Sequence, residues 1–203
     1  MSVHEPQVQI RALGPADIEA AASLLGRGMA DNPMHLTVYG HDEARSERRH
    51  AQLVRVLLRH SPSLRVFGVE RSGSLLGVLA SAAPGHCRPT VAARARLLGR
   101  ASTFGPRTAW KLLEWNTGWA SHDPAEPHVH LGPVSVDRGL RGQGIGGLLM
   151  RPHVDGLDAV GAVGYLETDR PTAVGFYRRF GYSVVAQSDI VGVPCWFMRR
   201  PAA

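Results

Sequence analysis

The chain is poor in cysteine and in long apolar stretches. Its 203 residues include 2 cysteines, Cys87 and Cys195, which stand far apart and form no C-x-x-C pair. This pattern supports neither a disulfide framework nor a thiol-rich metal site. No run of about 18 apolar residues is present, so we expect no transmembrane helix and no membrane partner. The first residues, MSVHEPQVQIRAL, lack the apolar segment of an export signal, and we therefore expect a cytoplasmic protein.

Lysine is almost absent, since Lys111 is the one lysine among 23 basic residues. The formal net charge of +6 is local, because segment 88–111 carries six basic residues and no acid. They are Arg88, Arg94, Arg96, Arg100, Arg107 and Lys111. Such a segment can steer an anionic ligand or contact nucleic acid. It lacks an interleaved aromatic platform, so we interpret it as a solvated helix face and expect no specific nucleic-acid partner.

The apolar periodicity predicts a single mixed α/β domain over residues 1–203. Strands are expected at about 8–11, 64–70, 75–81, 128–136, 163–168, 181–186 and 194–199. Helices are expected at about 43–59, 145–156 and 172–180, and from Pro15 until Asp31-Asn32-Pro33 breaks the helix. A helical insertion at about 88–120, interrupted at Gly99 and at Gly105-Pro106, separates the third strand from the fourth.

A glycine-rich stretch, RGQGIGG from Arg141 to Gly147, precedes the apolar run of a helix. It satisfies G-x-G-x-x-G, and Glu167 lies 20 residues after the last glycine, as in a dinucleotide site. Five residues separate the glycines from the preceding strand, however, and 36 residues after Glu167 are too few for a second nucleotide-binding half. The loop also lacks the GK[ST] ending of a nucleoside-triphosphatase loop. Glycines at the start of a helix instead fit the pyrophosphate of another ligand, which bare backbone N–H groups would hold.

The segment Arg141-x-x-Gly144-x-Gly146 resembles the R/Q-x-x-G-x-G/A motif of the GNAT superfamily of N-acetyltransferases, which binds the pyrophosphate of acetyl-CoA. HLGPVSVDRGLRGQGIGGLLM is similar to that family's fourth strand, pyrophosphate loop and third helix, and YLETDRPTAVGFYRRFGYSVV to its fifth strand, fourth helix and sixth strand. The resemblance is strong over about 127–185 and weaker but colinear over 8–81. It implies a mixed, mostly antiparallel central sheet of about seven strands flanked by helices and splayed between the fourth and fifth strands.

Two positions depart from the family pattern. Arg170 stands where an asparagine is often found, seven residues before the tyrosine, although Ala173 keeps the alanine three residues later. This departure bears on polar contacts to the pantetheine arm. Pro152 falls inside the third helix, where it loses a backbone bond to Leu148, and we expect a kink there.

The resemblance implies that acetyl-CoA is the co-substrate and that its pantetheine arm enters the splay. Gly132-Pro133 agrees with this, because proline has no N–H for a neighbouring strand. A backbone N–H near Val134 would polarise the thioester carbonyl. The cofactor-binding residues that follow are Val134, Ser135, Val136, Arg141, Gly142, Gln143, Gly144, Ile145, Gly146, Gly147 and Thr168.

Tyr177 is the candidate general acid, since a phenol keeps its proton at neutral pH. Periodicity alone would favour a packing role beside Phe176 and Phe180, and the resemblance reverses that preference. The general base is left open between Glu167 and two histidines, His128 and His130, which share one face of a strand. The sequence shows no third ligand beside the paired histidines, so we expect no metal.

These observations predict an N-acetyltransferase that moves an acetyl group from acetyl-CoA to an amine by direct attack on the thioester. The alternative is a catalytically silent CoA-binding regulatory module with the same fold. The acceptor is expected to be a small-molecule or peptide amine, held by 31–39 and by Trp115 and Trp119, unless these tryptophans are core residues. The sequence leaves open whether two copies form a homodimer.

Overall fold

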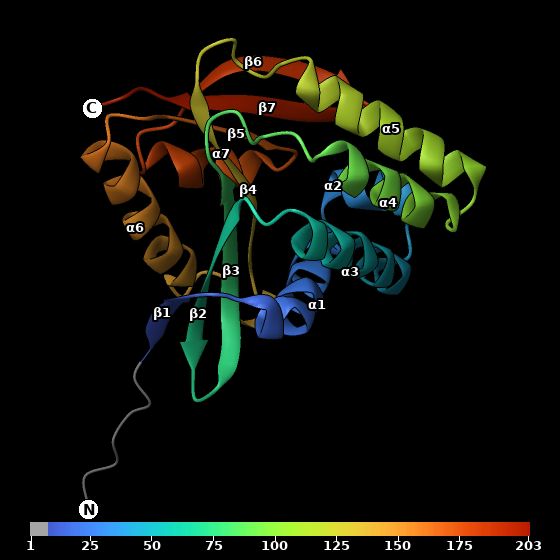
Figure 1. The fold of residues 1–203 in the computed structure, drawn as a ribbon, viewed down its shortest axis with the longest axis horizontal. Helices are drawn as coiled ribbons and strands as arrows, with labels where there is room; N and C mark the ends of the chain where they lie inside the picture. Colours follow the sequence, from blue (N-terminus) through green and yellow to red (C-terminus); the bar gives the residue numbers. More distant parts are fainter. Residues whose placement is uncertain (1–7) are drawn as a thin grey trace, which may run out of the picture.

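A mixed seven-stranded sheet forms the centre of residues 8–203, the part of the chain that this computed structural model describes (Figure 1). The expectation about an export signal rests in part on residues 1–7, which lie outside that range. The strands are β1 Gln9–Ala12, β2 Leu64–Arg71, β3 Ser74–Ala82, β4 His128–Val136, β5 Val163–Thr168, β6 Ser183–Ile190 and β7 Val193–Arg200, in the order β1-β2-β3-β4-β5-β7-β6. All neighbours pair antiparallel except β4 and β5, which pair parallel. This confirms the predicted sheet.

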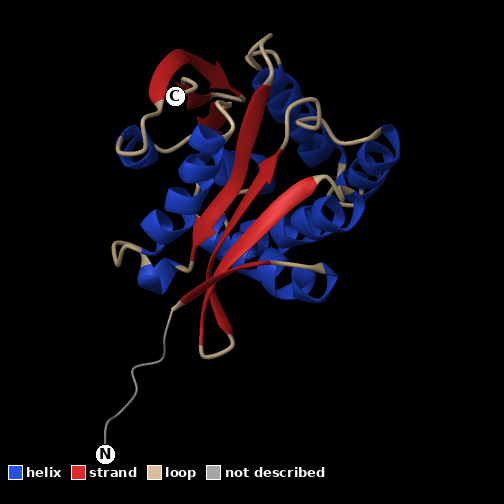
Figure 2. Ribbon diagram, turned by 60° about the vertical axis from the view of Figure 1, so that its left-hand side comes forward, coloured by secondary structure: helices blue, strands red, loops and turns tan. Residues whose placement is uncertain are grey.

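Helices cover both faces of the sheet (Figures 1 and 2). The helices are α1 Ile18–Met29, α2 Pro33–Tyr39, α3 Glu43–His60, α4 Val91–Ser102, α5 Pro106–Ala120, α6 Ile145–Ala159 and α7 Pro171–Arg178, with short 3₁₀ turns at Pro15–Asp17 and Arg138–Leu140. In Figure 1, α6 lies to the left of the sheet, while α1 to α5 gather to its right.

The core follows from the alternation of side chains along the central strands. Val78, Tyr165 and Phe197 pack against the α1–α2–α3–α5 side, and their next neighbours in sequence, Leu79, Leu166 and Met198, pack against the α6–α7 side. All six are buried. The sheet is therefore buried on both faces, and a cleft has to open between strands rather than above them.

One expectation about helix breaks was wrong. Gly99 lies inside α4 and does not interrupt it, because the cost of one helical glycine, about 1 kcal/mol, is tolerable in a helix that Thr90 caps by accepting the Ala93 N–H. The break expected at Asp31-Asn32-Pro33 is confirmed, since α1 ends at Met29, and Pro33 then takes the first position of a new helix, α2. Gly105, at φ 93°, does separate α4 from α5 as expected.

Two further boundaries differ from the prediction. Pro152 lies within α6, which continues to Ala159 rather than ending at Gly156. The strand expected at 181–186 begins at Ser183 and runs to Ile190, because Gly181 turns the chain at φ 83°. Among residues 8–203, none of the helices combines the length and the apolar character needed to cross a bilayer.

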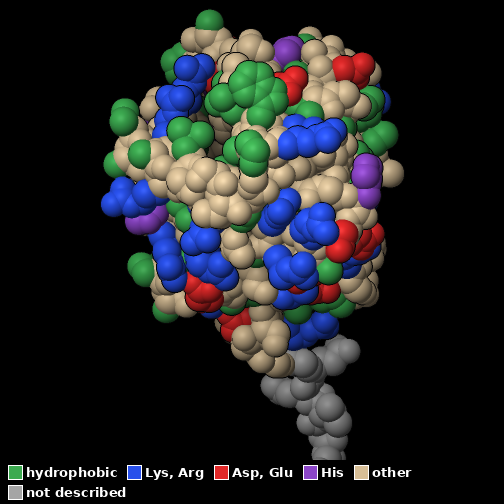
Figure 3. Space-filling model, turned by 90° about the vertical axis from the view of Figure 1, so that its right-hand side faces the viewer, with side chains coloured by type: hydrophobic (Ala, Val, Ile, Leu, Met, Phe, Trp, Pro, Cys, Tyr) green, Lys and Arg blue, Asp and Glu red, His purple; other side chains and the backbone are tan. Residues whose placement is uncertain are grey.

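The basic segment lies on α4, α5 and the loop before α4. Figure 3 views this end of the molecule and shows Lys and Arg side chains spread over it. Arg94, Arg96, Arg100 and Arg107 are exposed, while the Lys111 ammonium donates to the Thr37 carbonyl at 2.9 Å. Four solvated guanidinium groups thus account for most of the exposed positive charge of this segment.

Candidate active site

The sheet splays between β4 and β5. The two strands pair at His128–Val163, Val129–Gly164 and His130–Tyr165, and their pairing ends there. Beyond this point β4 continues along β3 to Val136, and β5 continues along β7 to Thr168. The β4 backbone from Leu131 onward thus has an edge that β5 does not cover, at the place where Pro133 offers no N–H.

A cavity of about 1300 Å³ occupies this splay. The predicted pantetheine contacts, Val134, Ser135 and Val136, line it together with Thr168 and Tyr177. The glycine loop contributes Arg141, Gly142, Gly144, Ile145, Gly146 and Gly147. Gln143 is the predicted contact that is not among the lining residues, and its side-chain amide instead donates to the Gly139 carbonyl at 3.4 Å.

The loop opens α6 with a bare helix terminus. Gly142 and Gly144 have φ of 82° and 84°, in the left-handed region that glycine occupies at little cost. Gly144 caps α6 without a side chain, and the first intrahelical bonds run from the Gly147 and Leu148 N–H groups to its carbonyl. The N–H groups before Gly147 have no intrahelical partner, and they belong to residues that line the cavity, where they suit an anion.

Gly146 and Gly147 have different surroundings. A Cβ on Gly146 would lie 3.1 Å from the Phe176 ring, so this glycine lets α6 pack closely against α7. A Cβ on Gly147 would meet no atom within 4 Å, although the residue lines the cavity. Packing against Phe176 therefore explains the glycine at position 146. No neighbouring protein atom explains the glycine at position 147.

Arg141 is bound to the end of α1 and its following turn. Its guanidinium donates to Asp31 at 2.8 and 3.0 Å and also to the Gly28 carbonyl. Arg170, at the position of the family's asparagine, donates to Asp31 at 3.0 Å and to the Asn32 side chain at 2.9 Å. Hydrogen bonds from Arg141 and then Arg170 hold the pKa of Asp31 well below its usual value.

Tyr177 lies on α7 beside Phe176 and Tyr182, with ring centroids 5.2 and 6.1 Å away. It packs against the α6–α7 core and also lines the cavity. Both roles considered for it are therefore compatible with its position. Burial raises the pKa of Tyr177 above its usual value, so the phenol holds its proton firmly.

His130 and Glu167 meet across the splay. The imidazole Nε2 lies 2.8 Å from the Glu167 Oε2, and the imidazole Nδ1 lies 3.8 Å from the Asp123 Oδ1. Burial alone would lower the pKa of His130, but the Glu167 carboxylate, with Cys87, outweighs it and raises the pKa to about 10. The fourth and fifth strands thus place a histidine and a carboxylate at the uncovered edge.

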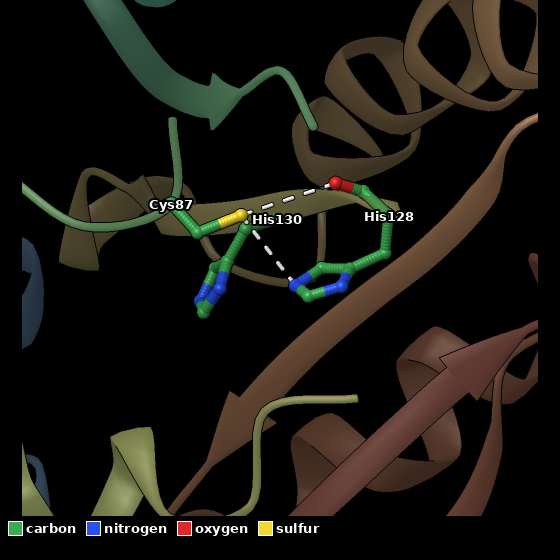
Figure 4. Close-up of side chains that lie close together, drawn as sticks. All are labelled: Cys87, His128 and His130. Carbon is green, nitrogen blue, oxygen red and sulfur yellow. Dashed lines mark hydrogen bonds between the residues drawn. The ribbon is translucent and has the colours of Figure 1, made fainter. Parts of the chain in front are cut away.

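His128 faces another group. Its Nδ1 lies 2.9 Å from the Glu126 carbonyl, and its Nε2 lies 3.5 Å from the Cys87 sulfur (Figure 4). It shares a face of β4 with His130, as predicted, and their ring centroids are 6.0 Å apart. It is not among the residues that line the cavity, so Glu167 and His130 are the better placed of the three candidate bases.

A sequence model of the acetyltransferase (GNAT) family matches residues 32–182. The chain belongs to this family. Acetyl-CoA is the typical co-substrate of GNAT proteins, in agreement with the cavity and the glycine loop. The antiparallel sheet with one parallel pair also rules out the dinucleotide interpretation, which requires a parallel sheet.

Solved structures agree on the fold. A histone acetyltransferase HPA2 and related acetyltransferase from Corynebacterium glutamicum matches with a TM-score of 0.67 and 20% identity, over 98% of this chain and 97% of that chain. A GNAT acetyltransferase from Brucella melitensis in complex with acetyl-CoA matches at 0.56 and 19%, over 96% and 88%. A Drosophila melanogaster polyamine N-acetyltransferase, which forms N-acetylagmatine, matches at 0.66 and 13%, over 96% and 100%.

Sequence reasoning missed Asp123 and the role of Cys87 beside the histidines. Both come from loops, before β4 and after β3, and no motif marks either of them. The sequence also left open whether Trp115 and Trp119 are core residues or pocket residues. In the structure both tryptophans have both roles. They pack on the core beside α2 and line the cavity with His35, Tyr39 and His50.

Proposed function

We propose that this GNAT protein transfers an acetyl group from acetyl-CoA to the amine of a small molecule or peptide by direct attack on the thioester. One observation supports the proposal: a single cavity is lined by an uncovered strand edge, a helix terminus that suits an anion, a protonated phenol and a histidine–carboxylate pair. The first two suit CoA, and the last two suit proton transfer.

In this mechanism the amine nitrogen attacks the thioester carbon and the C–S bond breaks. The backbone N–H near Val134 stabilises the negative charge that develops on the carbonyl oxygen. Tyr177 donates its proton to the leaving thiolate, and solvent restores that proton. The Glu167 carboxylate, paired with the protonated His130, receives the proton that the attacking nitrogen loses.

The cofactor side is assigned to the loop and the strand edge. Val134, Ser135, Val136 and Thr168 would bond the pantetheine arm. Gly142, Gly144, Ile145, Gly146 and Gly147 would surround the pyrophosphate through backbone N–H groups, with Gln143 contributing its backbone alone. Arg141 would act by fixing the loop to Asp31 rather than by a free guanidinium.

The test is a panel of amines incubated with acetyl-CoA, in which acetylated products are measured by mass spectrometry and CoA binding by calorimetry. We expect CoA to bind and at least one primary amine to gain an acetyl group. CoA binding without any acetylated product across small amines, peptides and polyamines would support the silent regulatory module instead. No CoA binding would overturn both.

A further inference from the structure

Cys87, His128 and His130 bring three metal-ligating side chains together (Figure 4). One ligand atom from each lies within 4.8 Å of the other two. Cys87 comes from the loop between β3 and α4, and the histidines come from one face of β4. The strand pattern predicts two imidazoles without a third ligand, and the fold adds a thiol to them.

We propose that Cys87, His128 and His130 form a binding site for one Zn²⁺ ion. A thiolate with two imidazoles is a donor set that zinc favours. When the ion binds, the Cys87 thiol and the protonated His130 imidazole each release one proton to solvent, and one Zn–S and two Zn–N bonds form without a change of oxidation state. Three protein ligands leave the fourth tetrahedral position to a water molecule, as in catalytic zinc sites.

The distances distinguish ligands from supporting groups. With bonds of about 2.3 Å to sulfur and 2.05 Å to nitrogen, two ligands of a tetrahedral zinc ion lie about 3.6 Å apart. The Cys87 sulfur and the His128 Nε2 are 3.5 Å apart. Nitrogen and oxygen ligands of one ion would be about 3.3 Å apart. The 2.8 Å between the His130 Nε2 and Glu167 is a hydrogen-bond distance, so Glu167 is a partner of the ligand and not a ligand itself.

The outer partners of both imidazoles match those of zinc-binding histidines. Such histidines bond a carboxylate or a backbone carbonyl through the nitrogen that the metal does not take. Here the His130 Nε2 bonds Glu167, and the His128 Nδ1 bonds the Glu126 carbonyl. The His128 Nε2 and the His130 Nδ1 remain for an ion. Within residues 8–203 the His130 Nδ1 is buried without a hydrogen-bond partner.

The local charge also favours a cation. The Asp123 Oδ1 is buried without a hydrogen-bond partner in the described chain and lies 3.8 Å from the His130 Nδ1. Glu167 adds a second carboxylate, whose side chain is 3% exposed. Arg88 also lies 3.8 Å from Asp123, but its side chain is 71% exposed. A divalent ion would offset both acids from inside the cavity, which Cys87 and His130 line.

The decisive experiment uses the reduced, metal-free protein without acetyl-CoA or amine, so its outcome is independent of the proposed acetyl transfer. Zn²⁺ is titrated by calorimetry, and Co²⁺ is added as a spectroscopic probe. We expect one Zn²⁺ per chain and the thiolate-to-cobalt charge-transfer band. Cys87→Ala, at a partly exposed position that the fold tolerates, should abolish this band and weaken Zn²⁺ binding at least about tenfold.

Two comparisons sharpen the result. His41→Ala, which removes an exposed histidine outside the cavity, should leave Zn²⁺ affinity unchanged, whereas His130→Ala should weaken it at least about tenfold. Zn²⁺ should also slow the alkylation of Cys87, measured by mass spectrometry. Cys195 serves as the internal reference, since its sulfur is buried. Wild-type affinity in Cys87→Ala, absence of the cobalt band in the wild type, or unchanged alkylation of Cys87 would each overturn the site.

Discussion

Arg141 and Asp31, 110 residues apart in the chain, form a bidentate ion pair with N–O distances of 2.8 and 3.0 Å. The pair joins the glycine loop to the turn after α1, and the Gly28 carbonyl accepts a further bond from the same guanidinium. Both terminal nitrogens of the Arg141 guanidinium therefore donate hydrogen bonds within the protein. This geometry changes what an arginine in a pyrophosphate motif would be expected to do, because its charge is already paired.

If Arg141 positions the loop, Arg141→Ala and Asp31→Asn should weaken CoA binding to a similar extent. We expect about a fivefold rise in the Kd of each variant, corresponding to ~1 kcal/mol for a partly exposed ion pair. The effects of the two changes should be less than additive in the double variant, since both break the Arg141–Asp31 pair. Calorimetric titration with CoA measures all three. A tighter Kd in Asp31→Asn would show that the arginine, once released, binds phosphate directly.

A substitution at Gly147 can change CoA affinity without lowering the stability of the fold. Gly147→Ala adds a methyl group at a residue that lines the cavity, and this group meets no protein atom within 4 Å. The melting temperature should stay level or rise, since alanine favours a helix by up to about 1 kcal/mol over glycine, while CoA affinity falls. Gly156→Ala is the matched control, because it lies in the same helix with the same open surroundings but outside the cavity. It should raise stability and leave CoA affinity unchanged. Equal CoA affinities in the two variants would place the phosphates elsewhere.

The central sheet could be predicted because local signals and the fold agree there. The strands at 128–136 and 163–168 have the predicted bounds, and Pro133 marks the splay through its missing N–H. The glycine-rich turn before α6 could be predicted because left-handed φ values at Gly142 and Gly144 favour that residue type. In each case one residue's backbone chemistry decides the local structure.

The remaining features depend on which distant segments meet. Nothing in the sequence around Asp31 indicates that it binds Arg141 and Arg170 at once. Cys87 reaches His128 because β3 and β4 pair and carry the loop after Ala82 to the start of β4. The contact between His130 and Glu167 is easier to predict, because both residues lie on strands that are expected to be neighbours. Side chains on loops are thus the ones that sequence patterns miss.

Buried histidines make stability depend on pH. Burial lowers the pKa of His50 to about 4, and burial together with Arg200 lowers that of His153 to about 4. In the unfolded chain histidine titrates near 6.5, so the unfolded state binds more protons between these values. The stabilisation is complete above pH 6.5 and is lost as pH falls toward 4. Each group should contribute a loss of about 2 kcal/mol between pH 7 and 5.

Urea unfolding at pH 7 and 5 measures this loss. His50→Gln, which keeps a neutral polar side chain next to His35, should reduce the difference between the two pH values by the roughly 2 kcal/mol of His50. His41→Gln, at an exposed position, should not change it. An undiminished pH difference in His50→Gln would mean that His50 is already protonated in the fold, against its buried position.

Tyr177→Phe tests the proposed general acid, because phenylalanine keeps the ring packing and removes the proton. With any amine that the protein acetylates, kcat should fall about 10²-fold or more. The apparent affinity for acetyl-CoA should change little, since the contact strengthens as charge develops on sulfur. Stability should change by no more than about 1 kcal/mol.

Tyr182→Phe is the matched control: it removes a hydroxyl 3.1 Å from the His153 Nε2, in the same core but outside the cavity. Its kcat should remain that of the wild type. Full turnover in Tyr177→Phe, with chemistry as the slow step, would leave Tyr177 a core residue and water as the proton donor.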